Sequence, residues 1–136
     1  MENKNSGPHT TIPTSIAPWL TVFNGANAAA FYKTAFGAVE TYRLEDPDGS
    51  VIARLSVNGA EFWISGGTAG NADTPASQDG AIRMILTVTD PDAFFAKALA
   101  AGATEVFPVS EDYGWRLGRL VDPYGHHWEI GRPLDT

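Results

Sequence analysis

The chain has 136 residues, of which 43% are hydrophobic and 18% charged, as expected for one soluble domain that buries a sizeable core. Its formal net charge of −7, without a run of Lys or Arg, excludes nucleic acid and an anionic membrane surface as partners. Since there is no cysteine, disulfides, thiolate-bound metals and a thiol nucleophile are excluded as well.

The first 15 residues predict a loose tail, because they are polar and are interrupted by Pro8 and Pro13. This segment lacks the apolar stretch of a signal peptide, and no part of the chain reaches the length of a membrane-spanning helix. We therefore expect a cytoplasmic protein, with a single domain over residues 16–136.

The first half of the domain predicts one strand, one helix and three further strands. Trp19–Phe23 is rich in β-forming residues, and the helix that follows is suited to end at Gly37. Its apolar face recurs at helical spacing and consists of Ala28, Phe31, Tyr32, Ala35 and Phe36. The turn sequences Asp46–Gly49 and Asn58-Gly59 separate the three strands Val39–Leu44, Val51–Val57 and Glu61–Ser65.

A polar stretch over residues 67–80, rich in Gly, Ala and Thr, predicts an exposed linker or lid. The order of elements then repeats, beginning with the strand Arg83–Thr89. Asp90 and Pro91 are typical of the first residues of a helix, and Gly102 is suited to end it. Three more strands follow at Glu105–Val109, Arg116–Val121 and His126–Ile130.

The two halves also share sequence at equivalent places. Leu20-Thr21-Val22 corresponds to Leu86-Thr87-Val88, Gly37-Ala38 to Gly102-Ala103, Gly59 to Gly125, and Arg54-Leu55 to Arg119-Leu120. Two copies of one supersecondary unit normally pack around a shared core. We therefore predict an α+β fold with two tandem βαβββ modules, at about 17–66 and 81–132, which form a curved mixed sheet around a cleft.

Two segments carry a resemblance to a known family. The helix sequence AAAFYKTAFGA and the terminal sequence YGWRLGRLVDPYGHHWEIG resemble the vicinal-oxygen-chelate superfamily, which includes glyoxalase I, bleomycin-resistance proteins and extradiol dioxygenases. The Gly-x-Arg followed by Asp-Pro-Tyr-Gly-His-x-Trp is most similar to its PhnB-like branch. The resemblance covers about residues 17–132 and implies a homodimer, because half-sites in this superfamily are often completed across a two-fold axis. It leaves the reaction open, since members perform unrelated chemistry.

In metal-using members, the resemblance implies four ligands from the first and fourth strands of each module, usually His, Gln or Glu. The matching positions here are Ala17, Trp63, Arg83 and Glu129. Of these only Glu129 can act as a ligand, because a methyl group and an indole cannot, and a guanidinium repels a cation. We expect no cofactor; the alternative is a divalent metal held by His127 and Glu129.

The remaining candidates suggest a mainly apolar ligand pocket with a few polar groups. Its predicted residues are Trp19, Trp63, Arg83, Trp115, Arg116, His127 and Glu129. Glu129 is the candidate catalytic residue, as a general base, or else the structural partner of Arg83 across the cleft. His127 is either a proton carrier or a structural hydrogen-bonding residue. Arg116 either binds an anionic ligand group or fixes its loop through Asp122 or backbone carbonyls.

These features favour a homodimer that binds an unknown small organic molecule by stacking and through an Arg/Glu pair, without the usual metal centre. Two alternatives stay open. One is a metal-dependent lyase or oxidoreductase of the glyoxalase or dioxygenase kind. The other is a metal-free isomerase in which Glu129 abstracts a proton.

Overall fold

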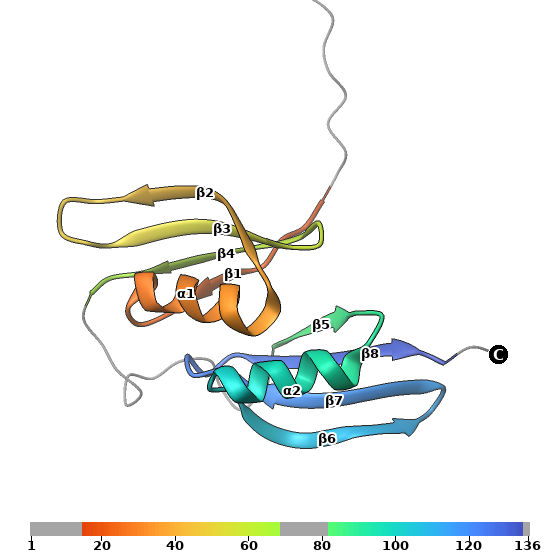
Figure 1. Ribbon diagram of the computed structural model, residues 1–136. Helices are drawn as coiled ribbons and strands as arrows, with labels where there is room; N and C mark the ends of the chain where they lie inside the picture. The colour runs from red at the N-terminus through yellow and green to blue at the C-terminus, as the bar shows by residue number, and fades with distance from the viewer. Residues whose placement is uncertain (1–14, 69–81, 135–136) are drawn as a thin grey trace, which may run out of the picture.

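A computed structural model of the chain describes residues 15–68 and 82–134. Over these ranges the chain forms two consecutive βαβββ modules (Figure 1). The tail residues 1–14 and most of the predicted linker at 67–80 lie outside the described residues. Within the described ranges, neither helix is long and apolar enough to cross a membrane.

The first module comprises β1 (Trp19–Thr21), α1 (Gly25–Phe36), β2 (Val39–Glu45), β3 (Val51–Val57) and β4 (Ala60–Gly66). Its strands lie in the order β1-β4-β3-β2, with β1 parallel to β4 and the other neighbours antiparallel. The Asn24 side chain accepts a hydrogen bond from the backbone N–H of Asn27, which satisfies one free donor at the start of α1. Gly37 ends the helix with φ of +68°, as predicted, because glycine adopts this left-handed conformation without strain.

The second module comprises β5 (Arg83–Thr87), α2 (Pro91–Ala101), β6 (Thr104–Asp112), β7 (Trp115–Val121) and β8 (His127–Pro133). Its strand order, β5-β8-β7-β6, repeats that of the first module. The Asp90 side chain accepts from the backbone N–H of Ala93, so the predicted start of α2 is confirmed. The two tandem modules are confirmed too, and the described strands form two four-stranded sheets, one in each module.

The helix sides of the two modules pack together around one core. Figure 1 shows α1 on the side of its sheet that faces the second module, and α1 and α2 contact each other. Trp128 of β8 reaches into the first module, with ring centroids 4.8 Å from Phe36 and 5.3 Å from Phe62. Phe36 also stacks on Phe94 of α2 at 6.0 Å. The modules therefore depend on each other for burial of their apolar faces.

A buried carboxylate joins the modules inside this core. Asp122 is only 3% exposed, and its oxygens accept hydrogen bonds from the Tyr32 hydroxyl at 2.5 Å and from Trp128 Nε1 at 2.9 Å. The backbone N–H groups of Tyr124 and His126 donate to it as well, at 2.9 and 3.0 Å. Burial, with the nearby Asp122 carboxylate as a second cause, raises the pKa of Tyr32 well above its ordinary value of 10.0. The hydroxyl therefore keeps its proton and donates a hydrogen bond to Asp122.

Candidate functional site

Each sheet turns alternate residues away from the helices, and we call these surfaces the outer faces. In β3, Ala53 and Leu55 are buried towards the core, whereas Arg54 between them lies on the outer face. In β8, Trp128 is buried and Glu129 lies on the outer face. Most of the ligand-binding residues that the sequence predicted lie on these outer faces.

A row of mostly aromatic residues crosses the outer face of the first sheet. Trp19, Trp63, Arg54 and Tyr42 are successive cross-strand partners on β1, β4, β3 and β2, and we call them the first row. The Trp19 and Trp63 rings stack with centroids 5.8 Å apart and planes 15° apart, and the Tyr42 ring lies 5.7 Å from Trp63. Trp19 is 52% and Tyr42 45% exposed, so the first row presents a platform of ring faces to the exterior.

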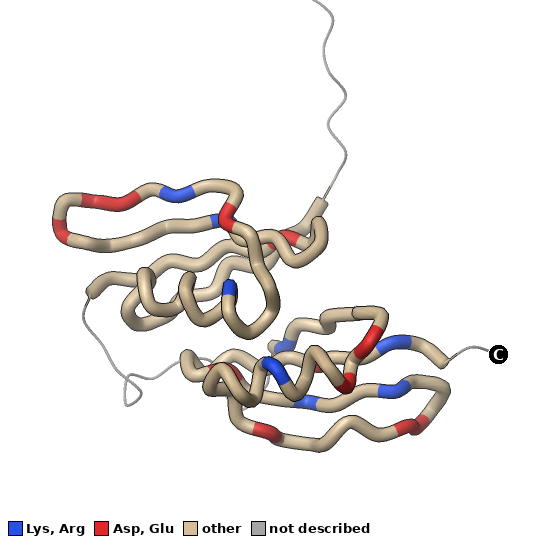
Figure 2. Tube along the Cα trace, viewed as in Figure 1, with Lys and Arg blue, Asp and Glu red and all other residues tan. Residues whose placement is uncertain are grey.

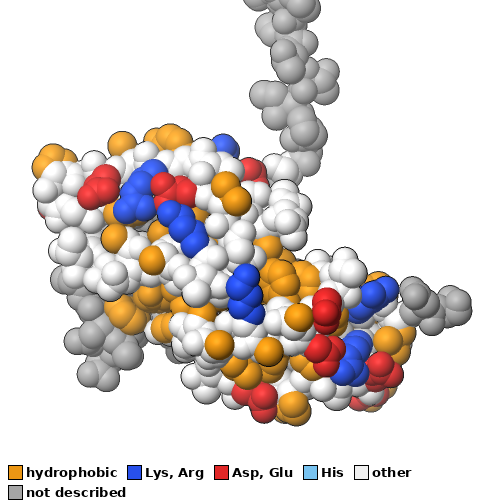
Figure 3. All heavy atoms as spheres, viewed as in Figure 1, with side chains coloured by type: hydrophobic (Ala, Val, Ile, Leu, Met, Phe, Trp, Pro, Cys, Tyr) orange, Lys and Arg blue, Asp and Glu red, His pale blue; other side chains and the backbone are white. Residues whose placement is uncertain are grey.

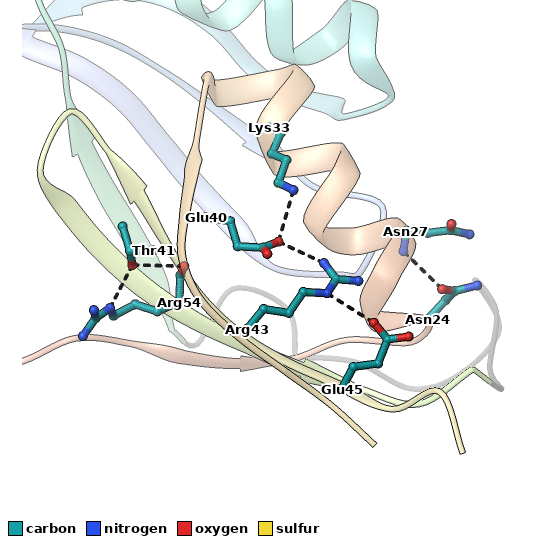
Figure 4. Close-up of polar contacts among 8 residues, drawn as sticks. All are labelled: Asn24, Asn27, Lys33, Glu40, Thr41, Arg43, Glu45 and Arg54. Atoms are coloured by element: carbon teal, nitrogen blue, oxygen red, sulfur yellow. Dashed lines mark hydrogen bonds and ion pairs between the residues drawn. The ribbon is translucent and has the colours of Figure 1, made fainter. Parts of the chain in front are cut away.

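The one charge of the first row is balanced within its own sheet. The Arg54 guanidinium lies 5.4 Å from the Trp63 ring centroid, within cation–π range. Its Nε donates to Thr41 Oγ1 at 2.9 Å and lies 3.6 Å from a Glu61 carboxylate oxygen. Figure 4 shows Arg54 turned to Thr41, apart from the separate ion-pair network of Glu40 with Lys33 and Arg43.

A charged row crosses the outer face of the second sheet at the equivalent place. Ile85, Glu129, Arg119 and Phe107 are successive cross-strand partners on β5, β8, β7 and β6, and we call them the second row. Two exposed apolar side chains flank its charged centre, since Ile85 is 65% and Phe107 60% exposed. Glu129 forms an ion pair with Arg83 of β5. Arg119 donates through Nε and Nη2 to Nδ1 of His127, at 3.3 and 3.2 Å.

The internal repeat relates the two rows to each other. Trp63 and Glu129 occupy the same place in the fourth strand of their modules, and Arg54 and Arg119 face them from the third strand. The sequence had aligned Arg54-Leu55 with Arg119-Leu120, but neither arginine was recognised as a site residue. The sequence therefore contained the information needed to find these arginines. A residue directly opposite a predicted ligand position on the neighbouring strand lies on the same face of the sheet.

The structure does not bring all predicted pocket residues together. Trp19 and Trp63 meet in the first row, whereas Arg83, His127 and Glu129 meet on the outer face of the second sheet. The predicted Arg83–Glu129 pair is present, but it joins adjacent strands of one sheet and does not span a cleft. Among the described residues, no hydrogen bond, ion pair or ring contact joins the first row to the second row, because the modules pack through their inner faces.

Trp115 and Arg116 lie at the start of β7, at one end of the second sheet. Trp115 lines an apolar pocket of about 290 Å³ together with Phe107 and Leu117. Arg116 instead binds Asp92 of α2 with two hydrogen bonds of 2.7 and 2.6 Å, and these lower the pKa of Asp92. The alternative in which Arg116 bonds Asp122 is therefore wrong, and Arg116 holds α2 against the β6–β7 hairpin.

The donor set at the four positions where the resemblance implies metal ligands does not fit a cation. Ala17 and Trp63 offer no lone pair for a metal, and Arg83 is a cation itself. The alternative pair fits no better, because His127 Nδ1 and the Glu129 carboxylate each face a guanidinium. Over residues 15–68 and 82–134, no group of three or more His, Asp or Glu side chains is placed to hold a metal.

A groove of about 870 Å³ lies between the modules, bordered by the β3–β4 turn, β5 and the first half of α2. Figure 3 shows hydrophobic side chains gathered in the hollow between the two halves of the molecule. None of the predicted pocket residues lines it. Figure 2 shows acidic and basic residues interspersed over both modules, so the acidic net charge does not gather on one visible face.

Comparison with known proteins identifies the class. Residues 21–131 match the family model described as a glyoxalase-like domain, so the chain belongs to this family. This match supports the vicinal-oxygen-chelate superfamily that the sequence resembles. The PhnB-like branch stays a prediction.

Individual relatives extend this result. An uncharacterized protein of Mycobacterium tuberculosis is 41% identical over 127 residues, which cover 88% of this chain and 75% of that protein. The X-ray structure of a gene product from Arabidopsis thaliana has a TM-score of 0.60 and 27% identity, covering 89% of this chain and 98% of that one. The fosfomycin resistance protein FosX of Listeria monocytogenes, complexed with Mn(II) and sulfate, has a TM-score of 0.66 at 17% identity, covering 90% and 93% of the two chains. FosX therefore shares the fold.

Proposed function

We propose that the protein is a homodimer that binds a small organic molecule between the first row of one chain and the second row of its partner. The observation that carries this proposal is the separation of the rows. One row offers ring faces and the other offers charges, and they lie on outer faces that one chain does not bring together. A binding site for an organic molecule needs both an apolar wall and a few polar groups.

Exposed apolar side chains support the dimer. Large hydrophobic residues lie exposed on strands at the edges of both sheets, namely Trp19, Tyr42, Leu44, Ile85 and Phe107. Exposed apolar side chains that gather on a sheet face are typical of an interface that a partner covers. The superfamily resemblance implies the same arrangement, since its half-sites are often completed across a two-fold axis.

In this assembly, the ligand would stack on the Trp19–Trp63 platform and meet polar groups from the opposite wall. Two parallel indoles offer a large, rigid contact area for a ring or another flat apolar group. The Arg83–Glu129 pair supplies a carboxylate and guanidinium N–H groups for a ligand's donors and acceptors. Binding of this kind requires no cation.

We expect the purified protein to have twice the mass of one chain by light scattering, and Ile85→Lys to shift it to a single chain. Ile85 is 65% exposed at the edge strand β5, and a lysine there can pair with Glu129, so the chain itself should stay folded. Ile16→Lys is the matched control, because Ile16 is 96% exposed and lies outside every described strand. A wild-type protein that stays a single chain at high micromolar concentration would refute the dimer.

Metal analysis separates the proposal from a metal-dependent enzyme of the FosX or glyoxalase kind. We expect untagged protein to carry far less than one equivalent of metal, and Mn²⁺, Fe²⁺ and Ni²⁺ to raise its melting temperature by less than about 1 °C. The physical reason is that Arg83 and Trp63 stand where a cation would need ligands. Stoichiometric metal together with a large stabilisation would contradict this expectation and favour the metal-dependent alternative.

A further inference from the structure

We infer that the ligand is an aromatic or similarly flat apolar acid, and that Arg119 is the residue that binds its oxyanion. This inference rests on the proposed function and names the class of ligand for the same site. Three observations carry it. Arg54 and Arg83 pair with carboxylates, whereas Arg119 pairs with His127, and the side chains near Arg119 in its row are apolar.

Arg119 has more hydrogen-bond donors than partners. A guanidinium carries five N–H groups and stays charged at every physiological pH. Among the described residues, Arg119 donates only to His127 Nδ1, through Nε and Nη2, and no carboxylate lies within ion-pair distance of it. Several of its N–H groups are therefore left for an external acceptor.

The other arginines near the rows are already balanced by carboxylates. Arg54, the equivalent residue of the first module, lies 3.6 Å from Glu61 and over the Trp63 ring. Arg83 pairs with Glu129. The centre of this outer face thus holds two guanidiniums and one carboxylate, that of Glu129. A second carboxylate, Asp112, lies at the end of β6, opposite Trp115.

His127 orients Arg119 without neutralising it. Because a guanidinium can only donate, His127 Nδ1 accepts these hydrogen bonds in the tautomer that carries its proton on Nε2, and an imidazole in this form brings no negative charge. A neutral acceptor holds the guanidinium plane in place and leaves its full charge for a ligand. We therefore assign His127 as a positioning residue for Arg119.

The surroundings of Arg119 indicate what is attached to the anion. Its cross-strand partner Phe107 is 60% exposed, and Ile85 lies on the far side of Glu129 in the same row. In the proposed dimer, the opposite wall is the Trp19–Trp63 stack. A simple inorganic anion would leave these apolar surfaces uncovered, whereas an acid attached to a ring would cover them.

The experiment compares acids with amides of the same ring system by calorimetry on the full chain, at neutral pH and low salt. The probes are benzoate and benzamide, 2-naphthoate and 2-naphthamide, and indole-3-acetate and indole-3-acetamide. We expect the acid to bind roughly 10- to 100-fold more tightly than its amide, as hydrogen bonds to charged groups imply. Arg119→Gln should abolish this preference, whereas Arg132→Gln, which removes the same charge at the end of β8, should retain it.

Each outcome decides a different statement. Equal binding of acid and amide would overturn the inference while leaving the proposed function intact, and a preference for the acid that survives in Arg119→Gln would overturn the role of Arg119. Failure of every probe to bind would overturn the inference about the ligand, whereas the proposed function would fail if the wild-type protein also stayed a single chain. If Arg119→Gln does not fold, Arg119→Lys decides, because a single ammonium cannot replace a two-pronged guanidinium and should weaken acid binding at least about 3-fold.

Discussion

Replacing Asp122 by alanine should lower the free energy of unfolding by about 3–5 kcal/mol. The side chain is 3% exposed and accepts hydrogen bonds from Tyr32, Trp128 and two backbone N–H groups. Without it, the Tyr32 hydroxyl and the Trp128 N–H stay buried without an acceptor, and each unsatisfied group costs about 1–3 kcal/mol. Urea unfolding followed by circular dichroism measures the loss.

Two other variants separate burial from charge. Tyr32→Phe removes one donor and leaves Asp122 three partners, so it should cost only about 1–2 kcal/mol. Asp92→Ala removes an exposed carboxylate that also binds an arginine with two hydrogen bonds, and it should leave the unfolding midpoint close to that of the wild type. If Asp122→Ala were as mild as Asp92→Ala, the buried carboxylate would not hold the modules together.

Trp128→Ala should also cost about 3–5 kcal/mol, the usual range when a large aromatic ring is removed from a packed core. Its ring centroid lies 4.8 Å from Phe36, 5.3 Å from Phe62 and 6.0 Å from Tyr32, all in the other module. Since both modules bury surface against this ring, we expect one cooperative transition with a lower midpoint and not two separate transitions.

The matched control for this prediction is Trp19→Ala. Trp19 is the same residue type on a strand of the other sheet, but it is 52% exposed, against 3% for Trp128. Trp19→Ala should lower the free energy of unfolding of the isolated chain by less than about 1 kcal/mol. It should also weaken the binding of aromatic ligands. Similar stability losses in the two variants would show that Trp128 does not hold the shared core.

The parts of the fold that could be predicted are those with local causes. The hairpin at Asn58-Gly59 forms where predicted because both residues adopt positive φ values, 52° and 95°. The Asp90 side chain begins α2 through a contact with a residue three positions away. Such signals need no knowledge of the rest of the chain, so the modules could be delimited from the sequence, with β6 and β8 extending further than expected.

The arrangement of the modules depends on contacts that are distant in sequence. Strand alternation correctly groups His127 with Glu129 and places Trp128 on the opposite side. It cannot show that the faces carrying Trp128 and Phe36 pack together and leave the two rows apart. For the same reason, Arg83 and Glu129 were expected to meet across a cleft, whereas the parallel pairing of β5 with β8 makes them neighbours.

The sequence predicted several residues of the candidate site, but not which side chains they contact. Trp63 and Glu129 were chosen from equivalent positions of the repeat, and the same comparison contained Arg54 and Arg119. The partners of these arginines could not be predicted, because rotamers and strand register decide whether a guanidinium meets Glu61 or His127.

The placement of the two rows on separate outer faces has a thermodynamic consequence for the proposed assembly. A molecule held between them contacts both subunits, so its occupancy and the association of the chains are linked equilibria. Ligand would then raise the fraction of assembled protein, and dilution below the subunit dissociation constant would release ligand even when every side chain of the site is intact. The concentration of the protein inside a cell would thereby set how strongly it retains its ligand.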